Sequence, residues 1–325
     1  MTYTSLWHRL TGIYPATEAQ AVVRMLLEEL AGLSLADLYA GGIDRLDDAQ
    51  RQQIERGMAR LEEGEPIQYV LGRASFCGRS FAVAPGVLIP RPETEELCRL
   101  IIDTHPQPLP KGGGKELMAD SCDPVEGCEQ PTPLPWGGAG DGCESLNILD
   151  IGTGSGCIAI TLALEMPDAE GEAVDISPEA LAIAEANAAR LGAKVSFHQY
   201  DILSEDSPPL GRGRGWVAPS TPKYDIIVSN PPYICERERA DMERNVLDYE
   251  PHTALFVPDD DPLLFYRAIA DYARKSLKPG GSLFFEINPL YTQELQALLR
   301  AMSYHTIETR NDQFGKPRMI RAIQA

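Results

Sequence analysis

A strand, a glycine-rich turn and the start of a helix follow one another over residues 149–160, and this run is the strongest constraint on the fold. Gly152, Gly154 and Gly156 stand between an apolar strand segment and the apolar residues 157–160. Glycines at such a turn let the backbone come close to a ligand. From residue 146 onward strand-like and helix-like segments alternate. This alternation predicts an α/β fold, a mainly parallel sheet with helices on both faces.

Acidic residues end the next two predicted strands. Asp175 follows the glycine turn by about 20 residues, the spacing at which a carboxylate binds ribose hydroxyls. Asp201 and Ile202 end a third strand, where an acid suits an adenine amino group and an apolar side chain suits the ring. The dinucleotide fingerprint places its third glycine one residue later than Gly156, so a nicotinamide cofactor is disfavoured. Each acid alone is expected to be a solvated strand end, but the series indicates a nucleoside site.

The tetrapeptide Asn-Pro-Pro-Tyr at residues 230–233 comes directly after the apolar run 224–229. Open α/β sheets bind their ligands at the carboxyl ends of strands. Two consecutive prolines remove two backbone donors, which leaves the carbonyls of Asn230 and Pro231 free to accept hydrogen bonds from an amino or amide nitrogen. A strand-ending turn with a surface tyrosine is the alternative for such a tetrapeptide alone. The glycine turn upstream favours a functional interpretation.

With these motifs the chain resembles the class I S-adenosylmethionine-dependent methyltransferases, and more closely the HemK/PrmC family. Four further segments carry the resemblance: residues 66–72, 87–97, 249–255 and 278–281. It implies a Rossmann-like seven-stranded sheet with a small N-terminal helical domain. It also implies methyl transfer from S-adenosyl-L-methionine to the side-chain amide of the glutamine in the Gly-Gly-Gln motif of class-1 peptide-chain release factors. Ile202 stands where many relatives have an aromatic residue, so the adenine wall is expected to be weaker there or supplied by another side chain.

The motifs and the resemblance together assign site residues. Asn230 and Pro231 are expected to orient the substrate amide, and Tyr233 to pack against it, so positioning supplies most of the catalysis and no general base is expected. The predicted substrate-binding residues are Asn230, Pro231, Pro232 and Tyr233. The predicted cofactor-binding residues are Asp150, Gly152, Thr153, Gly154, Ser155, Gly156, Asp175, Asp201, Ile202 and Asn230. Arg91 and Glu93 either shape the loop near the cofactor or form a structural salt bridge.

The chain is expected to divide into four parts. Residues 1–75 form an N-terminal helical, substrate-binding domain, residues 76–104 a hairpin and a connecting helix, and residues 147–325 the methyltransferase domain. Residues 105–146 are rich in glycine, proline and acids and are expected to form a disordered insertion, with a second insertion at about 206–221. A phosphate-binding loop at residues 111–115 is disfavoured because the Walker pattern is absent.

Composition narrows the partners and the compartment. The formal net charge of −19 argues against direct binding of nucleic acid, which depends on lysine and arginine neutralising phosphates. The first nine residues show no signal pattern and no long apolar stretch is present, so a cytoplasmic protein without membrane contact is expected. Seven cysteines suggest free thiols. The cluster Cys122, Cys128 and Cys143 has no zinc spacing, so no metal is predicted.

Three other functions remain open on sequence. A DNA adenine-N6 or RNA guanine-N2 methyltransferase would present an amino group to a similar tetrapeptide but needs base extrusion and a basic reading surface. A glutamine methyltransferase of a ribosomal protein is closer, although its counterpart of residues 90–95 resembles Pro-Arg-Ser more than the Pro-Arg-Pro-Glu found here. A scaffold that only binds the cofactor would keep the glycine turn and lose Asn230.

Overall fold

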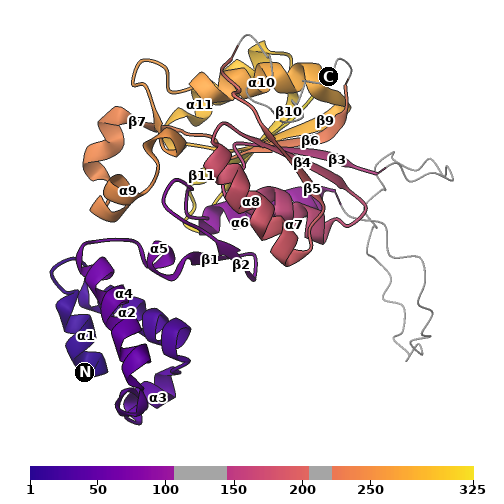
Figure 1. Cartoon of the computed structure of the whole chain (residues 1–325). Helices are drawn as coiled ribbons and strands as arrows, with labels where there is room; N and C mark the ends of the chain where they lie inside the picture. Colours follow the sequence, from indigo (N-terminus) through magenta and orange to yellow (C-terminus); the bar gives the residue numbers. More distant parts are fainter. Residues whose placement is uncertain (106–144, 205–221) are drawn as a thin grey trace, which may run out of the picture.

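The computed structural model describes residues 1–105, 145–204 and 222–325. The predicted insertions therefore lie almost entirely outside the described residues. The first helices form a group of their own, joined to the rest of the molecule through α5 and the strands β1 and β2 (Figure 1). These helices are α1 (Tyr3–Arg9), α2 (Ala16–Ala31), α3 (Leu35–Tyr39), α4 (Asp48–Glu62) and α5 (Ile67–Leu71), with the 3-10 turn η1 (Gly42–Arg45).

Local sequence explains where these helices begin and what they bury. Thr2, Ser34 and Asp47 each cap a helix with a side-chain oxygen that accepts from the backbone N–H three residues on. The apolar stripes of α2 and α4 join in one core cluster, in which Leu26 and Met58 are fully buried. Because this cluster is separate from those around the sheet, the helical region has its own core.

A hairpin and one helix connect the helical region to the sheet. The hairpin pairs β1 (Arg73–Phe76) with β2 (Arg79–Ala82), so it begins three residues before the Phe76 start that the sequence pattern predicts. The helix α6 (Pro92–Thr104) begins with proline at its first turn and carries Glu93 and Glu95 there, as its sequence predicts.

The core of the molecule is a seven-stranded sheet in the order β10-β11-β9-β6-β3-β4-β5. The strands β9, β6, β3, β4 and β5 run parallel, and β11 and β10 close the sheet antiparallel. The predicted mainly parallel α/β sheet of a class I methyltransferase is confirmed. The strand bounds are β3 Asn147–Ile151, β4 Glu170–Asp175, β5 Val195–Gln199, β6 Tyr224–Ser229, β9 Leu277–Glu286, β10 His305–Asn311 and β11 Pro317–Ile323.

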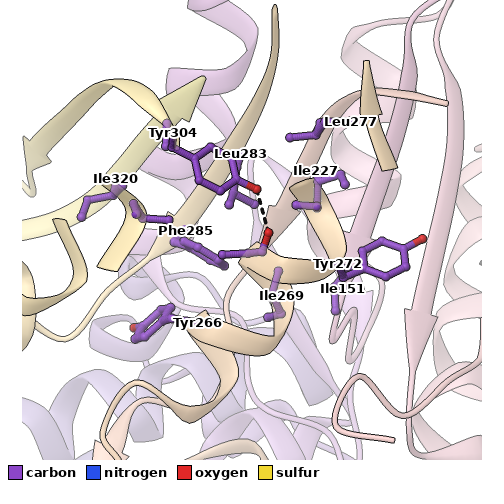
Figure 2. Packing of buried hydrophobic residues seen from close by; sticks show 14 of the residues in the cluster. Ile151, Ile227, Tyr266, Ile269, Tyr272, Leu277, Leu283, Phe285, Tyr304 and Ile320 are labelled. Carbon is purple, nitrogen blue, oxygen red and sulfur yellow. Dashed lines mark hydrogen bonds between the residues drawn. The ribbon is translucent and has the colours of Figure 1, made fainter. Parts of the chain in front are cut away.

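Helices cover both faces of this sheet. One face carries α6, α7 (Cys157–Glu165) and α8 (Pro178–Leu191), and the other carries α10 (Leu264–Ser276) and α11 (Thr292–Ala301) (Figure 1). On the second face, Tyr266 and Ile269 of α10 pack against Phe285 of β9, and the Tyr304 hydroxyl donates to a carbonyl of α10 (Figure 2). The sheet is therefore buried on both sides, as parallel sheets usually are.

Strand register lines up residues at the carboxyl ends of the parallel strands. Ser229 of β6 pairs with Phe285 of β9 on one side and with Ile151 of β3 on the other, and Ile151 pairs with Val174 of β4. The next residues along these strands are Glu286, Asn230, Gly152 and Asp175. These four residues stand in one row at the carboxyl edge of the sheet.

The chain after β6 forms a cap beside this edge. It contains the short parallel pair β7 (Ile234–Cys235) and β8 (Phe256–Val257) and the helix α9 (Arg244–Tyr249). The 3-10 turns of this part of the chain are η2 (Glu236–Asp241), η3 (His252–Ala254) and, after β9, η4 (Pro289–Tyr291).

Candidate active site

A cavity of about 450 Å³ opens at the carboxyl edge of the sheet and is called the large cavity here. Its volume falls within the range of roughly 300–1,000 Å³ found for small-molecule sites. Its wall brings together residues from four predicted motifs. The predicted site residues in that wall are Gly152, Gly154, Asp175, Asp201, Ile202, Asn230, Pro231 and Pro232.

The glycine turn leaves open space on the cavity side. Gly152 and Gly154 have φ of 74° and 55°, a left-handed conformation that favours glycine. A Cβ at Gly152 would meet no atom within 4 Å, and one at Gly154 would meet only Val87, at 3.8 Å. A side chain at either position would therefore project into space that a ligand can fill.

The Asp175 side chain holds the backbone near the glycine turn and also lines the large cavity. Its Oδ2 accepts from the N–H of Gly154 at 2.8 Å, and its Oδ1 accepts from the N–H of Ser177 at 2.9 Å. Burial raises the pKa of this carboxyl, and the backbone N–H groups oppose that shift. Since each carboxylate oxygen has two lone pairs, Asp175 can accept further hydrogen bonds from the large cavity.

Four of the predicted cofactor residues lie behind this wall. Asp150 is fully buried and accepts from the Thr153 hydroxyl at 2.6 Å and from the N–H of Ala159 at 3.3 Å, which fixes the turn to the start of α7. Burial raises the pKa of Asp150 to about 7. Thr153 and Ser155 are also buried. A Cβ at Gly156 would lie 2.8 Å from Ile160 and 3.1 Å from Ala184, so the glycine is needed for packing against α8.

A second cavity of about 250 Å³, the small cavity, adjoins the first. Leu88, Asn230, Pro231 and Ala254 line both cavities. The remaining wall of the small cavity is mostly apolar, with Arg91, Glu243 and Glu286 as charged members. Asn230 and Pro231 therefore stand in the wall that separates two binding spaces.

A chain of hydrogen bonds holds the Asn230 side chain. Its Nδ2 donates to Thr94 Oγ1 at 3.1 Å, and the Thr94 hydroxyl donates to Glu286 Oε2 at 2.6 Å. The Tyr233 hydroxyl donates to Glu286 Oε1 at 3.0 Å. Tyr233 lines the small cavity and not the large one. Its hydroxyl is engaged with Glu286, so the ring is what it presents to an occupant.

An ion pair between half-buried Arg91 and buried Glu250 supports the same wall. Arg91 pairs with Glu250 at 2.5 Å, and Glu250 also accepts from the N–H of Ile89 at 3.2 Å. Arg91 thus forms a structural salt bridge, which was one of its two expected roles, and its partner in this salt bridge is Glu250. The Tyr69 hydroxyl donates to the carbonyl of Val87 at 2.7 Å, which ties the end of the helical region to the loop that lines both cavities.

Comparison with known proteins matches both parts of the chain. A family model described as a PrmC N-terminal domain matches residues 8–72, and one described as a methyltransferase domain matches residues 144–309. The release factor glutamine methyltransferase of Bacteroides thetaiotaomicron is 42% identical over 96% of this chain and 95% of its own length. The chain belongs to the release factor glutamine methyltransferase family.

A second curated relative agrees with this membership. The release factor glutamine methyltransferase of Flavobacterium psychrophilum is 36% identical over 98% of this chain and 96% of its own length. Among solved structures, the 16S rRNA N2 G1207 methyltransferase of Thermus thermophilus gives a TM-score of 0.46 at 17% identity, over 78% of this chain and 50% of that one. The expected HemK/PrmC resemblance is confirmed.

Several residues of the site are not singled out by the sequence motifs. These residues are Thr94, Glu250 and Glu286, which lie in or beside recognised segments. Most of their hydrogen-bond partners are more than 130 positions away in the chain, and Tyr233 and Glu286 are 53 positions apart. The large cavity also has aromatic walls at Tyr200, Phe256 and Phe265, whereas Ile202 was the predicted wall. These aromatic side chains are candidates for the adenine wall that an aromatic residue at position 202 would otherwise supply.

Metal sites and membrane-spanning helices can be assessed for the described residues. Within residues 1–105, 145–204 and 222–325, no cluster of three or more histidine, cysteine, aspartate or glutamate side chains could hold a metal ion. The cysteine cluster at 122, 128 and 143 lies outside these ranges. No helix of the described chain is long and apolar enough to span a membrane.

Proposed function

We propose that this protein transfers a methyl group from S-adenosyl-L-methionine to the side-chain amide nitrogen of the glutamine in the Gly-Gly-Gln motif of class-1 peptide-chain release factors. The observation that carries the proposal is the shared wall, in which Asn230 and Pro231 face both cavities. A methyl donor in one cavity and an acceptor in the other would meet at that wall. Relatives with the name release factor glutamine methyltransferase support the choice of acceptor.

The large cavity suits S-adenosyl-L-methionine, which supplies a methyl group on a positively charged sulfur when bound. Gly152 and Gly154 leave room beside the backbone, and Asp175 offers lone pairs to ribose hydroxyls. Asp201 would accept from an adenine amino group, with Ile202 and the neighbouring aromatic rings along the face of the base. Asp150, Thr153, Ser155 and Gly156 would act indirectly, by holding the turn in shape.

The acceptor nitrogen is a poor nucleophile because its lone pair is delocalised into the amide carbonyl. Asn230 Oδ1 and the Pro231 carbonyl would accept the two amide hydrogens and aim the lone pair at the large cavity. The same oxygens would stabilise positive charge as it develops on the nitrogen. The Tyr233 ring would pack against the flat amide, and Pro232 would hold the turn rigid. One amide hydrogen then leaves as a proton, without a dedicated base.

The helical region is the proposed second contact for the release factor. It is fixed next to the small cavity, because the Tyr249 hydroxyl of α9 donates to the carbonyl of Glu63 at 3.0 Å and Val246 of the same helix lines that cavity. Binding energy from such remote contacts can be used to position the reacting amide. The net charge of −19 disfavours nucleic acid as the partner. A substrate of this kind places the protein in the cytoplasm.

Methyl transfer to separate candidates tests the proposal. The purified full chain and S-adenosylmethionine with a labelled methyl group are incubated with a folded release factor, a Gly-Gly-Gln peptide, a ribosomal protein, DNA or RNA. We expect strong labelling of the folded release factor, weak labelling of the peptide, and one added methyl group on the glutamine by mass spectrometry. Label on nucleic acid or on the ribosomal protein, with the release factor untouched, would overturn the proposal.

A further inference from the structure

We propose that Glu286, acting through Thr94, sets the direction of the hydrogen bonds that orient the Asn230 amide, so that both are positioning residues for the reaction. This inference rests on the proposed function, because it matters only if Asn230 Oδ1 accepts from a substrate amide. The two side chains come from α6 and from the end of β9, and both are almost fully buried, with exposures of 2% for Thr94 and 1% for Glu286.

The direction follows from counting donors. An ionised carboxylate can only accept hydrogen bonds. Thr94 has one hydroxyl hydrogen, and it lies on the 2.6 Å contact to Glu286 Oε2. The Thr94 oxygen can therefore only accept at its 3.1 Å contact with Asn230, which must present its NH2 group there. The carbonyl oxygen Oδ1 of Asn230 is then left to face the cavities that Asn230 lines.

A neutral group in place of the carboxylate would remove this constraint. A protonated or amide side chain at position 286 can donate to Thr94, and the Thr94 hydroxyl is then free to donate to Asn230. The Asn230 amide would rotate and turn its NH2 group toward the substrate. Two NH2 groups cannot hydrogen-bond to one another through their hydrogens, so the acceptor would lose one of its two anchors. A negative charge at Glu286 is therefore what fixes the Asn230 amide in the orientation that the acceptor needs.

Several groups face this carboxylate and decide whether it stays charged. Tyr233 and Thr94 donate to it, Arg318 of β11 attracts it, and Glu93 of α6 repels it. The Tyr266 hydroxyl of α10 donates to the backbone carbonyl of Glu286, at 3.2 Å, and not to its carboxylate. Arg91 lines the same cavity but pairs with Glu250. Burial is the largest influence and raises the pKa of Glu286 above its ordinary value.

A pair of threonine variants tests the relay. Thr94→Val keeps the shape and removes the hydroxyl, whereas Thr94→Ser keeps it. Thr161→Val is the matched control, because Thr161 is equally buried and its hydroxyl has no hydrogen-bond partner in the described part of the chain. We expect Thr94→Val to lower kcat on a release factor about tenfold, the loss of one hydrogen bond in the transition state, with the KM for S-adenosylmethionine nearly unchanged. Thr94→Ser should restore most of the rate, and Thr161→Val should leave it at the parent value.

A pH profile tests the charge. In the parent, kcat should fall at low pH as Glu286 is protonated, because the raised pKa moves this limb toward neutral pH. Glu286→Gln should lower kcat by at least tenfold at neutral pH and abolish the acidic limb. Parent-like kcat in Thr94→Val, or an unchanged acidic limb in Glu286→Gln, overturns the inference while glutamine methylation by the parent persists. If the parent fails to methylate glutamine at all, the proposed function itself has failed.

Discussion

The two cavities share a wall but are built in different ways. The polar part of the large cavity is formed by turns at the ends of strands, and the polar groups of its glycine turn are held by neighbours within about one strand–helix unit, such as Asp175 with Gly154 and Ser177. The small cavity is held by buried charges, Glu250 with Arg91 and Glu286 with Thr94, whose partners are 159 and 192 positions away. The polar turn of the large cavity is therefore held by local contacts, whereas the network of the small cavity depends on the whole fold.

This difference predicts how each cavity responds to change. A substitution in the large cavity should act mainly on its ligand, and on stability only where the side chain also holds backbone N–H groups, as Asp175 does. A substitution in the network of the small cavity should leave a buried polar group without its partner, which costs stability as well as rate.

The largest expected effect separates the two ligands. Asn230→Ala should lower the single-turnover rate of glutamine methylation by a factor on the order of 10² or more, since it removes an acceptor that stabilises charge in the transition state. The affinity for S-adenosylmethionine, measured by calorimetry, should stay close to that of the parent. A normal turnover rate in this variant would contradict the role given to Asn230.

The second effect should appear in the large cavity. Asp175→Ala should weaken binding of S-adenosylmethionine by about 1.5–3 kcal/mol, because hydrogen bonds to a charged group are lost. This corresponds to a rise of roughly 10- to 150-fold in Kd. At saturating cofactor the rate should recover, the reverse of the pattern in Asn230→Ala. Equal affinity in variant and parent would show that Asp175 serves only the backbone.

A third substitution probes the charge that supports the small cavity. Arg91→Met should lower the free energy of unfolding by about 1–3 kcal/mol, because Glu250 is buried and keeps only the backbone N–H of Ile89. Arg99→Met is the matched control in the helix that follows Arg91, since Arg99 pairs with Glu95 in a more exposed contact worth about 0.3–0.5 kcal/mol. Urea denaturation of both variants measures the difference. Equal losses would mean that burial of Glu250 does not matter.

The smallest expected effect depends on pH and concerns Asp150. Its pKa in the folded protein is about 7, against an ordinary value of 3.8, so the folded state holds an extra proton between these values. Stability should therefore fall as pH rises through this window. In Asp150→Asn this contribution is absent, and between pH 5.5 and 7 its free energy of unfolding should fall by about 1–2 kcal/mol less than that of the parent. Parallel curves for the two proteins would contradict the raised pKa.

Sequence motifs predicted the fold and the large cavity better than the small one. Gly152, Gly154, Asp175, Asp201 and Ile202 all line the large cavity, because a turn after a parallel strand has only one edge of the sheet to occupy. The depth of each residue was harder to predict. A motif fixes the order of residues along the turn but not which side chains point into the protein, so Thr153 and Ser155 proved to be buried.

The small cavity shows why the remaining side-chain contacts could not be predicted from the sequence. Nothing local to Glu286 indicates that it contacts Thr94, because their meeting depends on the register of β9 beside β6 and on how α6 packs against β9. Likewise, the motif singles out Tyr233, which lines the small cavity, but its hydroxyl contact with Glu286 depends on the assembled sheet.

The register of the parallel strands also determines where the chain tolerates extra length. Residues 106–144 precede β3 and residues 205–221 precede β6, so both segments rejoin the described structure at the amino ends of strands. The row of Glu286, Asn230, Gly152 and Asp175 lies at the opposite, carboxyl edge of the sheet. Length added before a strand leaves its pairing intact, whereas one residue added within β6 or β9 would separate Asn230 from Glu286. For protein engineering, the six residues of β6 should therefore be left unaltered in number.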